Sequence, residues 1–162
     1  MVSKFTWTAY IPIFIIVALT AATLFCIVVC FDPAVYQMLV ILIPATVFAI
    51  LVLLWLIYGE LRTKIIKVDL EFDHMVIKRY YGLGAQVTIY YTDIDGFTIS
   101  ILPATNTAYE YLYLMKDGKK IGKLSQFYHK NYADLKTELQ VHIKDLGIVD
   151  YNSWQEIKDI FG

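Results

Sequence analysis

Formal charge is almost absent from the N-terminal third of this 162-residue chain, where residues 5–58 contain a single charged side chain, Asp32. Globular domains carry about one charged residue in four, so this stretch lacks the composition of a soluble fold. On each side of Asp32 runs an apolar segment of roughly 25 residues, long enough as a helix to cross a hydrocarbon core of about 30 Å. The sequence therefore predicts two membrane spans, at about 5–31 and 34–58.

Cysteine and histidine are scarce as well. The only cysteines, Cys26 and Cys30, lie inside the first apolar segment, and we expect them to act as small apolar residues rather than as a redox pair or a metal site. The three histidines, His74, His129 and His142, do not have the spacing of metal ligands. We therefore predict no metal site, no cofactor and no catalytic residue, and we do not expect an enzyme.

Long basic runs are missing too. From Glu60 to the C-terminus the chain has 13 Lys and Arg residues and 14 Asp and Glu residues, a net charge of −1. This balance argues against nucleic-acid binding, which needs an extended basic face. About 100 residues remain after the apolar segments, which is enough for one small domain with its own core.

The two spans are joined at Asp32–Pro33, so we expect an antiparallel hairpin. The first span is too long for a cleaved signal peptide and lacks the small-residue cleavage site. The turn carries no Lys or Arg, whereas Lys4, Arg62, Lys64 and Lys67 flank the outer ends. The positive-inside rule then predicts a bacterial inner-membrane protein with both termini in the cytoplasm. Aromatic residues typical of membrane interfaces lie near the same ends: Trp7, Tyr10, Trp55 and Tyr58.

Small residues spaced four apart occur in both spans, as Ala18 with Ala22 and as Ala45 with Ala49. Such pairs let helix backbones approach closely, so they are predicted to form the contact within the hairpin. The alternative is that they mediate oligomerisation, and the oligomeric state stays open. Pro44 lies inside the second span and predicts a kink there.

After the spans, apolar and polar residues alternate, which is typical of half-buried strands. We predict strands at 66–72, 75–81, 86–91, 97–101, 109–113 and 119–124, with Asp117–Gly118 as a hairpin turn. A helical stripe follows from Tyr132 to Leu146, with Asn131 as N-cap and Gly147 as its end. The fold class is thus a membrane α-hairpin (1–62) plus an α+β domain (63–147), with a C-terminal extension (148–162) that has a short helix from Ser153.

The order of these elements, the stretch Tyr91–Ile94 before the fourth strand, and Phe127–Tyr128 before the helix resemble a known family. It comprises small bacterial membrane proteins with a PH-like domain (bacterial pleckstrin-homology, YcxB-like or YdbS-like) after a two-helix hairpin. The resemblance implies a partly open antiparallel β-barrel capped by a C-terminal helix, and no shared catalytic activity. Asp73–His74 occupies the first hairpin turn, where lipid-binding PH domains usually carry basic residues.

Two groups of residues in the predicted domain are candidates for binding. A basic cluster near one hairpin is a candidate for contact with anionic lipid, or else a solvated hairpin: Lys116, Lys119, Lys120 and Lys123. Alternating tyrosines are candidates for contact with a protein, together with the loop 103–107, or else for strand and core packing: Tyr109, Tyr111 and Tyr113.

The function predicted from the sequence is that of a non-enzymatic inner-membrane protein. Its PH-like domain would bind an unidentified protein partner or orient on the lipid bilayer. A second hypothesis is an immunity or antitoxin-type protein that neutralises a toxin at the membrane. A third, a membrane-bound enzyme, has the least support, because no motif brings catalytic groups together.

Overall fold

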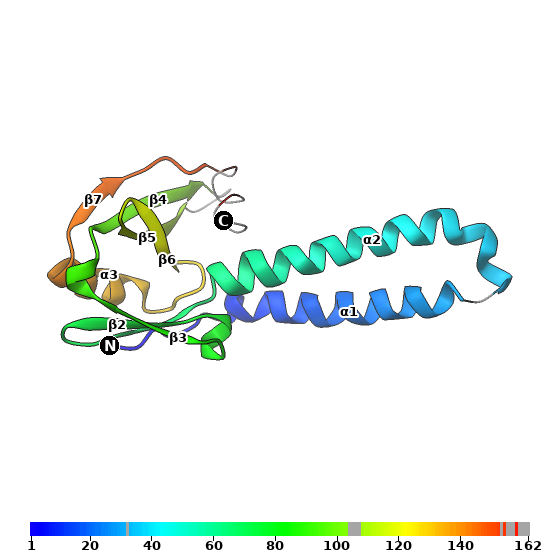
Figure 1. Ribbon diagram of the computed structural model, residues 1–162, viewed down its shortest axis with the longest axis horizontal. Helices are drawn as coiled ribbons and strands as arrows, with labels where there is room; N and C mark the ends of the chain where they lie inside the picture. Colours follow the sequence, from blue (N-terminus) through cyan, green and yellow to red (C-terminus); the bar gives the residue numbers. More distant parts are fainter. Residues whose placement is uncertain (32, 104–107, 153, 155–157, 159–162) are drawn as a thin grey trace.

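The computed structural model describes residues 1–31, 33–103, 108–152, 154 and 158. Two long helices project from one side of a small domain built of strands and a short helix (Figure 1). Helix α1 spans Ile11–Val29 and follows a 3₁₀ turn, and α2 spans Leu39–Trp55 between a 3₁₀ turn and a π-helical turn. The α+β class predicted from the sequence is confirmed.

Two helical segments, Trp7–Val29 and Tyr36–Leu61, are long and apolar enough to cross a membrane. Only 11% and 6% of the residues in their most apolar windows are buried by the rest of the chain. A core helix of a soluble protein would be mostly buried. The exposed apolar side chains of these two helices therefore require an apolar environment outside the chain. The two predicted spans are confirmed as helices of membrane-spanning length, and the second extends three residues further than expected.

The contact between the two helices runs along a different stripe from the predicted one. Ala18, Ala22 and Ala45 are exposed, and only Ala49 is half-buried. Each exposed alanine precedes a residue of the true contact stripe, and one residue turns an α-helix by about 100°. The stripe follows spacings of three and four residues through Pro12, Ile16, Leu19, Thr23 and Cys26 on α1 and through Leu39, Leu42, Thr46, Ala49 and Leu53 on α2.

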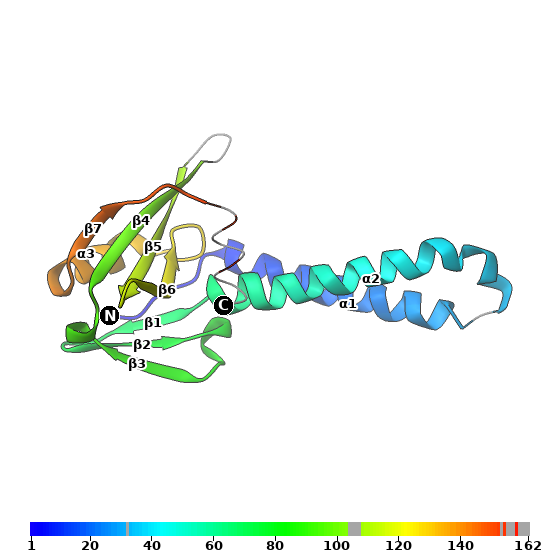
Figure 2. The same cartoon turned by 45° about the horizontal axis from the view of Figure 1, so that its top comes forward.

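Seven strands form two separate sheets in the described part of the domain (Figure 2). The first sheet is antiparallel and contains β1 (Lys67–Leu70), β2 (His74–Lys78) and β3 (Gln86–Tyr90). The second has the order β6-β5-β4-β7 and contains β4 (Gly96–Pro103), β5 (Ala108–Lys116), β6 (Lys119–Ser125) and β7 (Asp145–Ile148). The described strands do not close into a barrel.

The core lies between the two sheets, where α3 (Tyr132–His142) also packs (Figure 1). Met75 from the first sheet, Phe97 and Leu112 from the second, and Leu135 from α3 are fully buried in one cluster. These residues follow the period of two in the strands and of three to four in the helix that the sequence displays. The two sheets and α3 therefore form one domain.

The predicted C-terminal end of α3 is wrong. The helix ends at His142, and Ile143 is already extended (φ −133°, ψ 151°). Residues Asp145–Ile148 then form β7, which pairs in parallel with β4. Leu146 has helical spacing from Leu139 and Ile143, so the sequence predicts a longer helix. A strand of only four residues with an irregular register is too short to show the alternation by which strands are recognised.

The first six residues belong to the domain, although the sequence suggested only a membrane flank before the hairpin. Ser3 N donates to Val68 O (2.7 Å), and Thr6 N donates to Tyr128 O (2.9 Å). The side chain of Asn131, at the expected N-cap position of α3, instead donates to Val2 O (3.0 Å). The N-terminus therefore ties β1 to the segment before α3.

Three predictions fall on residues outside the described part of the chain. They are the contribution of Asp32 to the turn, the loop at 104–107, and most of the short helix expected from Ser153.

Candidate functional site

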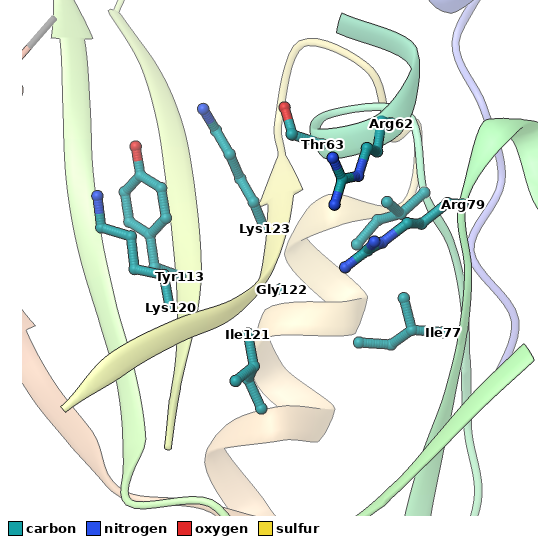
Figure 3. Close-up of a pocket in the computed structure, with 10 residues that line it drawn as sticks. Arg62, Thr63, Ile77, Arg79, Tyr113, Lys120, Ile121, Gly122 and Lys123 are labelled. Atoms are coloured by element: carbon teal, nitrogen blue, oxygen red, sulfur yellow. The ribbon is translucent and has the colours of Figure 1, made fainter. Parts of the chain in front are cut away.

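A pocket of about 110 Å³ opens between strands β2 and β6, beside the domain end of the second span (Figure 3). Its wall combines apolar groups, such as Ile66, Ile77 and Ile121, with four cationic side chains. The cations come from three separate elements: Arg62 after the second span, Arg79 after β2, and Lys120 and Lys123 from β6.

Arg62 is positioned by a buried polar junction at the base of the hairpin. The π-helical turn Leu56–Leu61 directs Glu60 inward, where the carboxylate accepts from Tyr128 Oη (2.8 Å) and Lys64 Nζ (2.5 Å). Burial, and then the charge of Glu60, raise the pKa of the Tyr128 hydroxyl far above its usual range. Tyr128 therefore remains a hydrogen-bond donor to Glu60. Because Glu60 is held in place, Arg62, two residues further along the chain, is held in place as well.

Arg79 is positioned by an unusual turn. Tyr80 and Tyr81, which follow it, both have left-handed backbones (φ 52° and 59°). The carbonyl of Arg79 accepts from the amides of Gly82 and Gly84, each at 3.0 Å. In Figure 3 the guanidinium groups of Arg62 and Arg79 both point into the opening beside β6.

The two lysines belong to an aromatic surface on the outer side of the second sheet. Lys123 Nζ lies 3.8 Å from the ring centroid of Tyr111, and Lys120 Nζ lies 4.2 Å from that of Tyr113. Lys123 is only 6% exposed, so its charge is held by cation–π contact within the protein. Both lysines have partners, and they add to the positive potential of the pocket.

The pocket can attract an anion. No acidic side chain lines it among the described residues. Within the same part of the chain, neither Arg62 nor Arg79 forms an ion pair with an acidic group. Two guanidinium groups facing one opening repel each other, and a bound phosphate or carboxylate would relieve that repulsion while accepting paired hydrogen bonds.

The structure divides the predicted lysine cluster. Lys120 and Lys123 line the pocket, whereas Lys116 pairs with Asp93 (3.3 Å) near the β5–β6 turn. That turn also includes Lys119, which is exposed, and lies at the opposite end of β6 from Arg62. This geometry therefore disfavours a simultaneous contact of all four lysines with one membrane surface.

The tyrosines do not present the open surface expected for protein binding. Tyr111 and Tyr113 are 5% and 4% exposed, and their rings meet edge to face at 6.4 Å. The ring of Tyr151 also lies 6.3 Å from Tyr111. Tyr109 is half-buried and packs edge-on against Phe127. The alternating pattern thus reflects packing on the outer side of the sheet.

His129 is a buried polar group that the sequence did not single out. It is 1% exposed, and its Nε2 lies 2.8 Å from Ile66 O. Its Nδ1 lies 3.3 Å from Ser125 N, which can donate to it, and 2.9 Å from Ser125 O. Burial lowers the pKa of His129, and this outweighs the opposite effect of the two carbonyls. The neutral ring with the proton on Nε2 donates to Ile66 O and can accept from Ser125 N.

The stability of the domain should fall as the pH drops below about 6.5, the ordinary pKa of histidine. Because the folded state lowers the pKa of His129, its stabilising contribution is complete above that pH and is lost progressively below it. One proton accounts for at most about 1.4 kcal/mol per pH unit. Unfolding measured from pH 7.5 to 5 in the full chain and in His129→Gln should show a smaller pH dependence in the variant. Equal slopes in the two proteins would contradict this assignment.

The described residues include no cluster of three His, Cys, Asp or Glu side chains suited to a metal ion. Comparisons with family models, with curated proteins and with solved structures find no match to this chain. Any assignment of function therefore rests on the pocket and its position next to the two long apolar helices.

Proposed function

We propose that this chain is a membrane-anchored, non-enzymatic protein whose domain binds the anionic head group of a phospholipid in the pocket between β2 and β6. The observation that carries the proposal is the pair Arg62 and Arg79, which face one opening without an acidic partner among the described residues. Arg62 directly follows the second membrane-length segment, which ends at Leu61. A lipid phosphate at the membrane surface would lie at the same level as this arginine.

The anchoring explains why a modest site would suffice. A cationic side chain near an anionic membrane surface gains about 1 kcal/mol. The hairpin already holds the domain at the bilayer, so the pocket would fix the orientation of the domain and the lipid composition around it rather than recruit it.

The finer features of the proposal follow from the sequence. The Lys and Arg distribution favours both termini in the cytoplasm of a bacterium, where the facing leaflet carries anionic lipids. Two facing sheets with a C-terminal helix are compatible with a PH-like domain, although the described strands form no closed barrel. The proposed pocket does not use the Asp73–His74 turn.

Lipid binding can be tested with the full chain in an uncharged maltoside detergent. Short-chain phosphatidylglycerol should raise the unfolding temperature, because a ligand that binds only the folded state stabilises it. In Arg62→Gln/Arg79→Gln the affinity should fall about thirty-fold, which corresponds to the loss of about 2 kcal/mol for two cationic side chains.

A matched control is Lys130→Gln/Lys144→Gln, which removes the same charge from two exposed positions outside the pocket. It should bind like the parent chain. Short-chain phosphatidylcholine should bind weakly. The same measurement with inorganic phosphate tests whether the pocket binds a free anion rather than a lipid. Equal binding by both double variants, or equal shifts with the zwitterionic lipid, would overturn the proposal.

A further inference from the structure

After Arg79, the loop between β2 and β3 is partly exposed and carries no charge. Residues 80–92 contain no charged side chain. Leu83, in the middle of the loop, is 89% exposed, and Val87 on the following strand is 48% exposed. A large apolar side chain that is almost wholly exposed loses contact with water only if something outside the chain covers it.

The loop is fixed to the base of the first span. The Tyr81 hydroxyl donates to the carbonyl of Ala9. The Tyr81 ring stacks on Tyr10 at 5.7 Å and packs against Phe5 at 5.3 Å. In both ribbon views the connection between β2 and β3 lies at the domain end of the two-helix hairpin (Figures 1 and 2).

The backbone of the loop is strained in a way that projects Leu83 outward. Tyr80, Tyr81 and Gly82 have consecutive positive φ angles of 52°, 59° and 91°. This conformation is unfavourable for a tyrosine, so the surrounding contacts must impose it. The carbonyls of Tyr80 and Arg79 accept from the amides of Leu83 and Gly84, both at 3.0 Å, which closes the turn.

We propose that the loop 80–84 is an interfacial anchor that inserts Leu83 into the head-group region of the bilayer crossed by the hairpin. The bilayer is the partner that we assign to the loop, because the loop packs next to aromatic residues at the domain end of the first span. Trp7 and Tyr10 there are 74% and 41% exposed, as residues of a membrane interface would be. Together with the hairpin, the anchor sets the angle of the domain on the membrane. It requires the hairpin but not the head-group pocket.

The test compares two exposed apolar positions at opposite ends of the first sheet. Leu83 lies at the membrane end, and Phe72, 92% exposed, lies in the β1–β2 turn at the far end. Leu83→Cys or Phe72→Cys is introduced into the full chain carrying Cys26→Ala and Cys30→Ala, and the new thiol is labelled with an environment-sensitive fluorophore. The chain is reconstituted in phosphatidylcholine vesicles with a spin-label quencher attached to the lipids near the head group.

Fluorescence from position 83 should shift to the blue and be quenched several-fold more strongly than fluorescence from position 72. Quenching at position 83 should persist without anionic lipid, under conditions that would empty the pocket, so the two proposals fail independently. Equal quenching at both positions would overturn the anchor. So would a blue shift at position 83 without lipid quenching, because a protein surface would then cover the loop. Matching unfolding temperatures of the labelled and parent chains establish that both variants fold.

Discussion

Gly96→Ala should destabilise the domain by about 3 kcal/mol or more. Gly96 has φ +153°, and a Cβ atom there would overlap the carbonyl of Lys144 and lie 2.8 Å from Leu146 Cγ. That carbonyl is fixed, because it accepts from Phe97 N (2.9 Å) where β7 joins β4. The variant must therefore separate β7 from β4 or distort the start of β4 next to the fully buried Phe97. Urea unfolding of the full chain in detergent measures the change in free energy.

Gly118→Ala separates backbone conformation from steric overlap. Gly118 also has a left-handed backbone (φ +70°), but no atom lies within 4 Å of the position of its added Cβ. This variant should cost only about 1 kcal/mol. Amide hydrogen exchange at Phe97 should accelerate in Gly96→Ala and not in Gly118→Ala. Equal destabilisation by the two substitutions would contradict the argument that the close approach of β7 is decisive.

The sequence was sufficient for the elements whose signals are local and repeated. Two apolar segments interrupted once by Asp32 specify two long helices, and alternation in strands such as β5 specifies which residues share a face. Asp117–Gly118 correctly placed the turn between β5 and β6, because a two-residue hairpin with positive φ angles favours these residue types.

The face of the sheet on which Lys123 lies could not be inferred from the residues near it in the sequence. Continuing the register from the hairpin pair Lys116 and Lys119 would put Lys123 opposite Leu112, on the core side of the sheet. A β-bulge between Leu114 and Met115 shifts the register, so Lys123 instead lies opposite Tyr113 on the outer side. A one-residue shift moves every later side chain to the other face. The aromatic surface around this lysine therefore could not be predicted.

The pocket could not be predicted for a different reason. From the sequence alone, Arg62 is a flanking charge that sets the topology, and Arg79 is part of a predicted strand. They meet because the second span leads directly into β1, which pairs with β2, so that the end of β2 returns to the base of the hairpin. Side chains brought together by sheet pairing have no fixed spacing in the sequence. The contact between residues 1–6 and the domain could not be predicted either, because it is made by backbone hydrogen bonds between segments far apart in the sequence.

Glu60→Gln should destabilise the chain by about 3–5 kcal/mol, because it removes the charge that neutralises a buried lysine. The side chains of Glu60 and Lys64 are 10% and 15% exposed and lie 2.5 Å apart. The amide can still accept a hydrogen bond from Tyr128, so the expected loss comes mainly from the uncompensated ammonium. Thermal and urea unfolding of the full chain measure it, and Tyr128→Phe, which removes one hydrogen bond, should cost only about 1–3 kcal/mol.

The double variant Glu60→Gln/Lys64→Met should recover most of the stability lost in Glu60→Gln, since replacing both members of a buried ion pair is often close to neutral. It should also preserve the pocket, because the amide at position 60 can still accept a hydrogen bond from Tyr128 and Arg62 follows that position by two residues. Lipid affinity should therefore return to nearly that of the parent chain where the unfolding free energy is restored, since Lys64 does not line the pocket. A single variant as stable as the parent would mean that Lys64 reaches water without Glu60, and the junction would then be a surface ion pair rather than the fixed point from which the pocket is built.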